Sequence, residues 1–118
     1  MSVGPQPRRI PLIFFRTGLG AEPVRDWLKT LPEVERREIG RDLMRAQWRW
    51  PVGMPLSRPL SDGLWEIRTQ LPTGRIARVL ICFYRGRLVA LHGFIKKTRK
   101  SPADDLGVAR SRKKELER

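Results

Sequence analysis

The stretch that decides the fold is LWEIRTQLPTGRIARVLICFYRGRLVALHGFIKKTRKSP, residues 64–102. It contains three strand-like runs joined by short turns, and it ends in a cluster of lysine and arginine. Between Trp65 and Lys100 there are nine basic residues and one acidic residue, Glu66. Several basic side chains alternate with apolar ones, which is typical of a strand that buries one face and exposes cations on the other. The stretch therefore predicts a cationic sheet face that binds a polyanion, with RNA as the leading candidate.

Three consecutive strands are predicted here, over residues 64–71, 75–84 and 87–95. The turns between them are too short for a crossover connection, so we expect an antiparallel meander. Symmetric pairing about Thr73 places Arg68 opposite Arg78. In the first strand Trp65, Ile67, Thr69 and Leu71 share one face and Glu66, Arg68 and Gln70 the other; in the second, Ala77, Val79, Ile81 and Phe83 share one face and Arg78, Leu80, Cys82 and Tyr84 the other.

Upstream of these strands, the apolar spacing becomes helical. Four apolar residues follow the i, i+3, i+4, i+7 pattern of a short amphipathic helix. Pro32 then suits the first turn of a second helix, and so tight a connection predicts an antiparallel helical hairpin. The first helix carries Val24, Trp27, Leu28 and Leu31 on its buried face, and the second carries Ile39, Leu43, Ala46 and Trp50.

The remaining segments complete the expected architecture. Residues 1–9 resemble a flexible N-terminal tail, residues 10–16 a first strand, and residues 51–63, with three prolines and two glycines, a connecting loop. A last helix is expected from about residue 102 to the C-terminus. The order of elements predicts a single α+β domain over residues 1–118, a small antiparallel β-sheet backed by an N-terminal helical hairpin, with a C-terminal helix. Helices packed on one face would leave the opposite face of the sheet free for binding.

Composition narrows the classes of function. The formal net charge is +13, from 25 Lys and Arg against 12 Asp and Glu, which favours an anionic partner. The single cysteine, Cys82, cannot form an intrachain disulfide and has no second ligand at metal-binding spacing, so we expect a buried thiol. The apolar run from Ile10 to Phe15 is too short for a signal-peptide core or a membrane span. We therefore expect a cytoplasmic protein with no metal, no cofactor and no membrane partner.

The arginines Arg68 and Arg78 are the leading candidates for a site. Cross-strand partners on one sheet face lie about 5 Å apart at Cβ. Two guanidinium groups at that distance repel each other, and a phosphate bound between them explains the pairing. RNA cleavage without a metal needs such cations to stabilise charge growing on the phosphorane, together with an acid and a base. We expect both side chains to be exposed. The alternative to phosphate binding is that the two arginines extend into solvent from an open sheet face and bind nothing.

His92, the basic run after the last predicted strand and three tryptophans each allow two interpretations, one structural and one functional. His92 is expected on the third strand of the meander, sharing a face with Leu88, Ala90 and Phe94, as either a structural or a site histidine. The basic run after that strand is either a solvated surface or a cationic rim beside the sheet face, with salt-dependent RNA binding. This run contains Lys96, Lys97, Arg99 and Lys100. Trp48, Trp50 and Trp65 could stack on bases, although core packing is favoured for Trp50 and Trp65.

The stretches LWEIR, RIARVLICF and above all LHGFIKKTRKSP, followed by a helix, resemble the RelE/ParE/HigB toxin superfamily, and within it the HigB-like, phage-related branch. The similarity covers residues 12 to 112, approximately. It implies the toxin of a type II toxin–antitoxin pair that cuts mRNA on the ribosome without a metal. It also implies a cognate antitoxin with a helix-turn-helix domain, and the ribosome and mRNA as further partners.

The resemblance also implies roles for individual residues. The catalytic set would be Arg68, Arg78, His92 and one of Lys96 and Lys97, and we expect Arg75, Arg99 and Lys100 to contact RNA. RelE has a tyrosine shortly after the last basic position, but residues 101–118 contain none, and the only tyrosine is Tyr84. The general acid and base are therefore unassigned. A catalyst built mostly from cations could still act if the ribosome aligns the mRNA.

Two other functions remain open at this point. ParE-type members of the superfamily poison DNA gyrase and do not cut RNA, and fold alone does not separate them from nucleases. A basic nucleic-acid-binding module without activity is the other alternative. The Arg68/Arg78 pair favours the nuclease, because a gyrase poison has no need of a phosphate-binding pair on its sheet.

Overall fold

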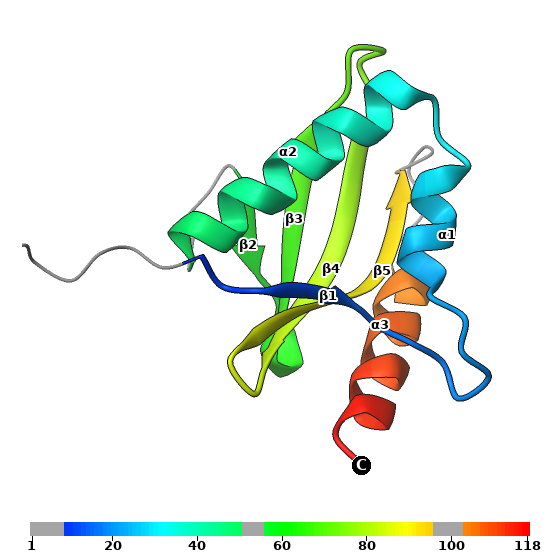
Figure 1. The fold of residues 1–118 in the computed structure, drawn as a ribbon, viewed down its shortest axis with the longest axis vertical. Coiled ribbons are helices and arrows are strands. Elements are labelled where there is room, and N and C mark those ends of the chain that lie inside the picture. Colours follow the sequence, from blue (N-terminus) through cyan, green and yellow to red (C-terminus); the bar gives the residue numbers. More distant parts are fainter. Residues whose placement is uncertain (1–8, 51–55, 96–102) are drawn as a thin grey trace, which may run out of the picture.

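Five strands form one mostly antiparallel sheet in the order β1-β5-β4-β3-β2, shown in Figure 1. The structure is a computed structural model and describes residues 9–50, 56–95 and 103–118. Strands β5, β4, β3 and β2 pair antiparallel, whereas β1 pairs with β5 in parallel. The strands are β1 (Leu12–Phe14), β2 (Ser57–Pro59), β3 (Leu64–Gln70), β4 (Ile76–Tyr84) and β5 (Arg87–Ile95).

Helices cover both faces of this sheet. On one face lie α1 (Pro23–Lys29), packed over β5, and α2 (Glu33–Arg49), packed over β3. The C-terminal helix α3 (Ala103–Leu116) packs on the other face, against β4 and β5. The α+β fold with N-terminal helices and a C-terminal helix is thus confirmed, but the expectation of a wholly open second face is wrong. Because α3 packs on β4 and β5, the described residues leave room for a site on this face over β2 and β3.

Each face has its own apolar core, which explains why α3 docks where it does. The alternating pattern of β4 sends Val79 and Ile81 towards α1 and α2, and Leu80 and Cys82 towards α3. Leu80 and Cys82 pack with Leu91 and with Ala109 of α3. The thiol of Cys82 is buried, as expected, and burial raises its pKa to about 11.

The β3–β4 hairpin has the predicted register, with Arg68 opposite Arg78. Its turn is closed by the Leu71 N–H, which donates to the Arg75 carbonyl over 2.8 Å, and Gly74 adopts a positive φ of 84° that glycine tolerates without strain. Strand β2 was not predicted, because it lies within the proline-rich segment expected to be a loop. Proline is acceptable there because β2 is an edge strand.

A β-bulge in β5 changes the face on which His92 lies. Leu80 pairs with His92 but the next residue, Ile81, pairs with Ala90, so Leu91 is an extra residue without a partner on β4. The alternation therefore shifts, and His92 lies on the α3 face, whereas Leu88 and Ala90 pack on the α1/α2 side. The expectation that His92 shares a face with Leu88 and Ala90 is wrong for this reason.

Close packing fixes α1 on β5. A Cβ added to Gly93 would lie 2.4 Å from two ring carbons of Trp27, so only glycine lets the helix approach this strand.

In the described ranges, no helix combines the length and apolar character needed to cross a bilayer.

Candidate nucleic-acid interface

Two cross-strand rows of side chains build the candidate site on the α3 face. The strand register places Arg58, Glu66, Leu80 and His92 side by side in one row across β2, β3, β4 and β5. It places Arg68, Arg78 and Phe94 in the neighbouring row across β3, β4 and β5. Because side chains two residues apart on a strand share a face, Glu66 is surrounded by three arginines. We call Arg58, Arg68 and Arg78, together with Glu66, the arginine cluster.

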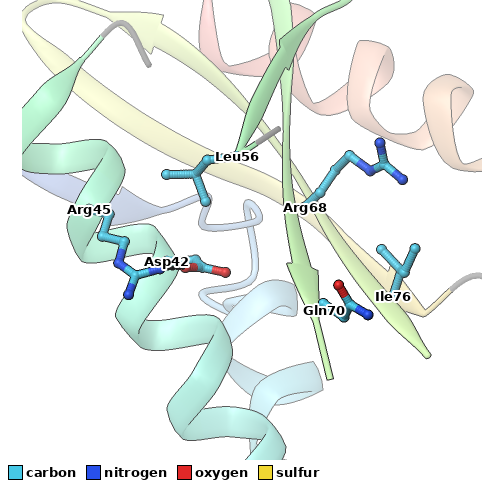
Figure 2. A pocket seen from close by; sticks show the side chains of 6 residues that line it. All are labelled: Asp42, Arg45, Leu56, Arg68, Gln70 and Ile76. Carbon is cyan, nitrogen blue, oxygen red and sulfur yellow. Dashed lines mark hydrogen bonds and ion pairs between the residues drawn. The ribbon is translucent and has the colours of Figure 1, made fainter. Parts of the chain in front are cut away.

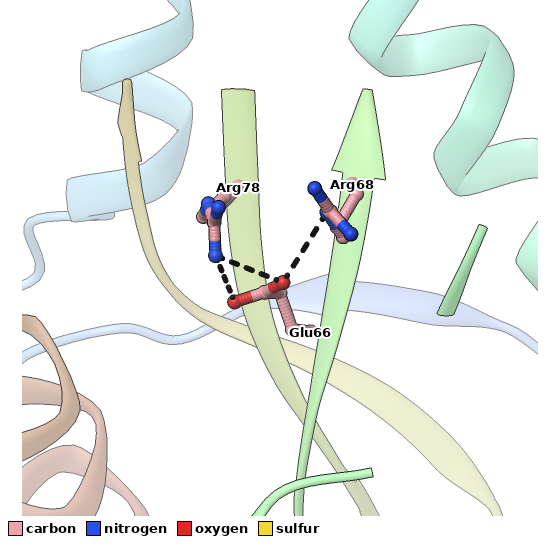
Figure 3. Close-up of polar contacts among 3 residues, drawn as sticks. All are labelled: Glu66, Arg68 and Arg78. Atoms are coloured by element: carbon pink, nitrogen blue, oxygen red, sulfur yellow. Dashed lines mark hydrogen bonds and ion pairs between the residues drawn. The ribbon is translucent and has the colours of Figure 1, made fainter. Parts of the chain in front are cut away.

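Glu66 lies between Arg68 and Arg78, as Figure 3 shows. Arg78 Nη1 donates to both carboxylate oxygens, over 3.2 Å to Oε1 and 3.1 Å to Oε2. Arg68 Nε lies 3.7 Å from Oε1, which is an ion pair but too long for a hydrogen bond. The chain thus supplies its own anion at the position where we expected a bound phosphate.

The two arginines differ in exposure. The Arg68 side chain is 31% exposed, but that of Arg78 is only 12% exposed. The expectation that both are exposed is therefore wrong for Arg78, which lies on a central strand and pairs with a carboxylate that is itself only 6% exposed. Burying a guanidinium there requires such a partner, since an unpaired charge in this position would be strongly destabilising.

One carboxylate does not neutralise three arginines, so the arginine cluster keeps two positive charges. Arg58 is exposed, and within the described ranges it forms no ion pair. The Nε of Arg78 is a buried donor with no partner among the described residues. A buried donor left unpaired is costly, and binding an acceptor would relieve that cost. The cluster can therefore still take an anionic or strongly polar ligand.

Two hollows adjoin the arginine cluster. A cavity of about 130 Å³ lies between the sheet and the first turns of α3, and Arg78 and Glu66 line it. A larger hollow of about 310 Å³ lies beside the exposed edge of β3, where β2 has ended (Figure 2). Residues of β3 and α2 line this second hollow, and Arg68 belongs to it. Its lining is Asp42, Arg45, Leu56, Arg68, Gln70 and Ile76.

His92 is engaged with α3. Its Nε2 lies 2.7 Å from Oδ1 of Asp105, and its Nδ1 lies 3.4 Å from Nη1 of Arg112. The same Arg112 atom donates to the Leu91 carbonyl over 2.7 Å, so the bulge itself is tied to the helix. Burial lowers the pKa of Arg112, with Glu115 acting in the opposite direction. His92 also stacks on Phe94, with ring centroids 5.6 Å apart and planes inclined by 23°.

Arg75 makes contacts that fasten the β3–β4 turn to α2. Its Nη2 donates to Oε2 of Glu35, whose side chain is only 4% exposed, and Thr73 Oγ1 lies 3.2 Å from the same oxygen. The Arg75 side chain remains 43% exposed. Part of its donor set is thus used within the fold, and its expected contact with RNA stays a prediction.

The basic run expected to form the rim falls outside the described residues. This applies to Lys96, Lys97, Arg99 and Lys100. Tyr84 lies at the hairpin end of β4, four residues along the same strand face from Leu80, with the Arg85 guanidinium 5.1 Å from its ring centroid. Trp50 and Trp65 contact each other edge to face at 4.8 Å against the core, as favoured from the sequence, while Trp48 is exposed.

Sequence reasoning missed Arg58, Glu66 and Phe94 as parts of the site. The sequence does not point to Arg58, because the three residues of β2, Ser-Arg-Pro, lie in a proline-rich segment and carry no strand signal. The strand alternation predicts Glu66 on the same face as Arg68. Glu66 is also the only acidic residue between Trp65 and Lys100, and this was the signal that could have marked it as the partner of the arginines. Among the described residues, no group of three or more His, Cys, Asp or Glu could hold a metal ion.

The fold and the arginine cluster define a small basic α+β protein with helices on both faces of a five-stranded sheet. Comparison with protein families then identifies it more closely: the chain belongs to the phage-derived protein Gp49-like (DUF891) family, whose model matches residues 26–114. That family is related to the RelE/HigB-like toxins, and the matched region runs from α1 through α3. A search of curated proteins found no match.

Proposed function

We propose that this protein is the toxin of a type II toxin–antitoxin pair and that it inhibits translation by cutting mRNA on the ribosome without a metal. The observation that carries the proposal is the arginine cluster, in which three arginines from β2, β3 and β4 surround one carboxylate on the open part of the sheet. Membership of the Gp49-like family supports it. The partners in this proposal are the ribosome, mRNA and a helix-turn-helix antitoxin, all in the cytoplasm.

Cleavage in this proposal proceeds by attack of a ribose 2′-hydroxyl on the adjacent phosphorus, which breaks the bond between that phosphorus and the 5′-oxygen of the next nucleotide. A base takes the proton of the 2′-hydroxyl and an acid protonates the 5′-oxygen, so the products are a 2′,3′-cyclic phosphate and a 5′-hydroxyl. Negative charge grows on the phosphorane oxygens, and fixed cations that meet those oxygens lower the barrier. Arg68 is the arginine placed to do so, because it is partly exposed and its distance to Glu66 leaves its hydrogen bonds unused among the described residues. Arg78 is more deeply buried and adds positive charge to the site, and its contact with Glu66 fixes the orientation of the cluster.

His92 acts in this proposal as a positioning residue. Both of its ring nitrogens face partners on α3, so it holds the helix against β5 and supports Phe94. Of the residues expected to be catalytic, Lys96 and Lys97 follow β5 directly along the chain and stay candidates for the cation near the leaving group. Alignment of mRNA by the ribosome would supply much of the remaining rate enhancement.

One observation favours the alternative of a gyrase-inhibiting toxin. Arg78 is nearly buried, and its Nη1 pairs with Glu66 within the fold, as in a structural ion pair. In a protein that only binds another enzyme, this structural role would be sufficient to explain Arg78. The two functions give different products in the cell, so one experiment separates them.

The test maps the 5′ ends of mRNA by primer extension after the protein is induced in cells. The proposal predicts new ends that fall in phase with codons inside translated frames, and their loss in Arg68→Ala. The matched control is Arg37→Ala on α2, an exposed arginine paired with Glu33 on the other side of the sheet. Intact messages together with DNA damage would overturn the nuclease and support gyrase inhibition. Lys96→Ala and Lys97→Ala in the same assay would show which lysine the reaction uses.

A further inference from the structure

The cavity between α3 and the sheet combines an apolar wall with a charged floor. We use "wall" for its apolar lining residues and "floor" for its charged lining residues: the first are Leu60, Leu80, Phe94 and Leu106, and the second are Arg58, Glu66 and Arg78. Its volume of about 130 Å³ is well below the roughly 300 Å³ at which pockets for drug-sized ligands begin. This volume suits one planar ring system rather than a whole nucleotide.

The wall suits a nucleobase. Proteins that read single-stranded RNA stack unpaired bases on aromatic side chains, and Phe94 is the aromatic residue that lines this cavity. The ring of Phe94 is held in place by its stacking on His92, which is itself bound to Asp105. An aromatic side chain fixed in this way loses little freedom when a base stacks on it.

The floor discriminates among the four bases. Among the described residues, the two carboxylate oxygens of Glu66 accept from a single donor, Arg78 Nη1, and a carboxylate has further lone pairs for two neighbouring N–H groups. Beside it, the buried Nε of Arg78 is a donor without a partner among the described residues. Guanine presents N1–H and the N2 amino group next to the O6 acceptor on its Watson–Crick edge. Adenine, cytosine and uracil do not present two adjacent donors beside an acceptor.

We propose that this cavity binds one unstacked guanine base of RNA, with Glu66 accepting from N1–H and N2–H, an Arg78 donor bonding O6, and Phe94 stacking on the ring. The inference rests on the proposed function in taking single-stranded RNA as the ligand. It makes Glu66 and Phe94 specificity-determining residues beside the phosphate-binding Arg68. Arg58, at the exposed margin of the floor, would contact the phosphate next to that base.

The test measures binding of the purified full-length protein to four labelled RNA pentamers by fluorescence anisotropy at low salt. The pentamers are all-uridine except at the central position, which is guanine, adenine, cytosine or uracil. The guanine pentamer is expected to bind about tenfold more tightly than the others, because a well-placed bidentate contact discriminates by roughly that factor. Equal binding of all four pentamers, or a preference for another base, would overturn the inference.

Two variants test the two halves of the cavity. Glu66→Gln keeps the shape of the side chain but removes the paired acceptors, so the guanine preference should fall to about twofold or less. Phe94→Leu keeps apolar bulk but loses the ring, and should weaken binding of the guanine pentamer by about fivefold or more. The matched control is Glu33→Gln, an exposed carboxylate of α2 on the other side of the sheet. A guanine preference that persists in a folded Glu66→Gln protein would refute the assignment of Glu66.

This experiment and the mapping of mRNA ends can fail separately. A protein that cuts mRNA but shows no base preference in the pentamers would retain the proposed function and lose this inference. A protein that prefers the guanine pentamer but leaves mRNA intact in cells would retain the cavity assignment and lose the nuclease.

Discussion

Glu66 gives the arginine cluster two properties at once. Its charge offsets one guanidinium, so a central strand can carry Arg78 almost buried. Its position next to Arg58 and Arg68 leaves the exposed side of the cluster positive. A single carboxylate thus holds the nearly buried Arg78 in place and leaves Arg58 and Arg68 as the more exposed arginines of the cluster.

Arg68→Ala and Arg78→Ala should therefore differ in their effect on stability. Removal of Arg78 leaves Glu66 charged and nearly buried without its hydrogen-bonding partner, and we expect this to lower the free energy of unfolding by about 3 kcal/mol. Removal of Arg68, which is partly exposed and not hydrogen-bonded to Glu66, should cost less than about 1 kcal/mol. Urea unfolding followed by circular dichroism measures both values.

The double variant Arg78→Ala/Glu66→Ala provides the control. If the cost of Arg78→Ala comes from the stranded carboxylate, removing Glu66 as well should recover much of it, and a double-mutant cycle would show strong coupling. Equal losses of stability for Arg68→Ala and Arg78→Ala would contradict the difference in burial on which this prediction stands.

At the scale of elements, α3 is held to β5 by the His92–Asp105 contact of 2.7 Å, and beneath the helix lies the thiol of Cys82. We expect Asp105→Ala to speed the reaction of Cys82 with a thiol reagent by about tenfold, because losing a charge-assisted hydrogen bond lets the helix open more often. Asp104→Ala is the matched control, since it removes a carboxylate from the same first turn, with the same favourable placement at the helix start. Equal labelling rates for the two variants would exclude the His92–Asp105 contact as the anchor.

The buried thiol also makes stability depend on pH. Burial raises the pKa of Cys82 from 9.0 to about 11, so the folded protein keeps the proton over a range where the unfolded chain releases it. The stabilisation that comes from the protonated thiol is fully present below about pH 9 and is lost as the pH rises towards 11. The free energy of unfolding falls by roughly 3 kcal/mol over this range. The difference in unfolding free energy between wild type and Cys82→Ala, measured with a reductant from pH 7 to 11, should therefore shrink above pH 9. A difference that stays constant over this range would rule out the raised pKa.

The elements that could be predicted are those whose signals are local. The β3–β4 hairpin follows from alternation and from the Pro-Thr-Gly turn, and the buried faces of α1 and α2 follow from helical spacing, as the burial of Val24, Leu28, Ile39 and Leu43 confirms. The bulge at Leu91 could not be predicted, because an inserted residue leaves no mark in a continuous apolar run. Its consequence, the shift of His92 to the α3 face, was therefore missed.

The site was predictable in part. The register of the hairpin placed Arg68 opposite Arg78, and this pairing is confirmed. The partner of the two arginines was not foreseen, since whether Glu66 turns towards Arg78 or towards solvent depends on burial by the neighbouring strands and α3. The place of Arg58 depends on β2, whose pairing with β3 is a tertiary contact that a three-residue segment does not signal.

For the molecule as a whole, the net charge of +13 predicts that the proposed RNA binding is strongly salt-dependent. Each phosphate contact to single-stranded RNA contributes about −0.7 to the slope of log K against log salt concentration. Arg68→Ala should therefore reduce the slope for the uridine pentamer by about 0.7, whereas Arg37→Ala should leave it unchanged. Identical slopes for wild type and Arg68→Ala would remove that residue from the phosphate-binding set.

The parallel pairing of β1 with β5 joins residue pairs such as Leu12 and Leu88, which are far apart in the chain. Forming this pair closes a long loop, a step that carries a large entropic penalty and is slow compared with the closing of the two neighbouring hairpins. During synthesis, β1 can gain its neighbour only after residues 87–95 of β5 have left the ribosome. Between the emergence of β5 and the docking of β1, one edge of β5 stays unpaired, so a newly made chain passes through an interval in which it is prone to self-association and open to capture by another strand.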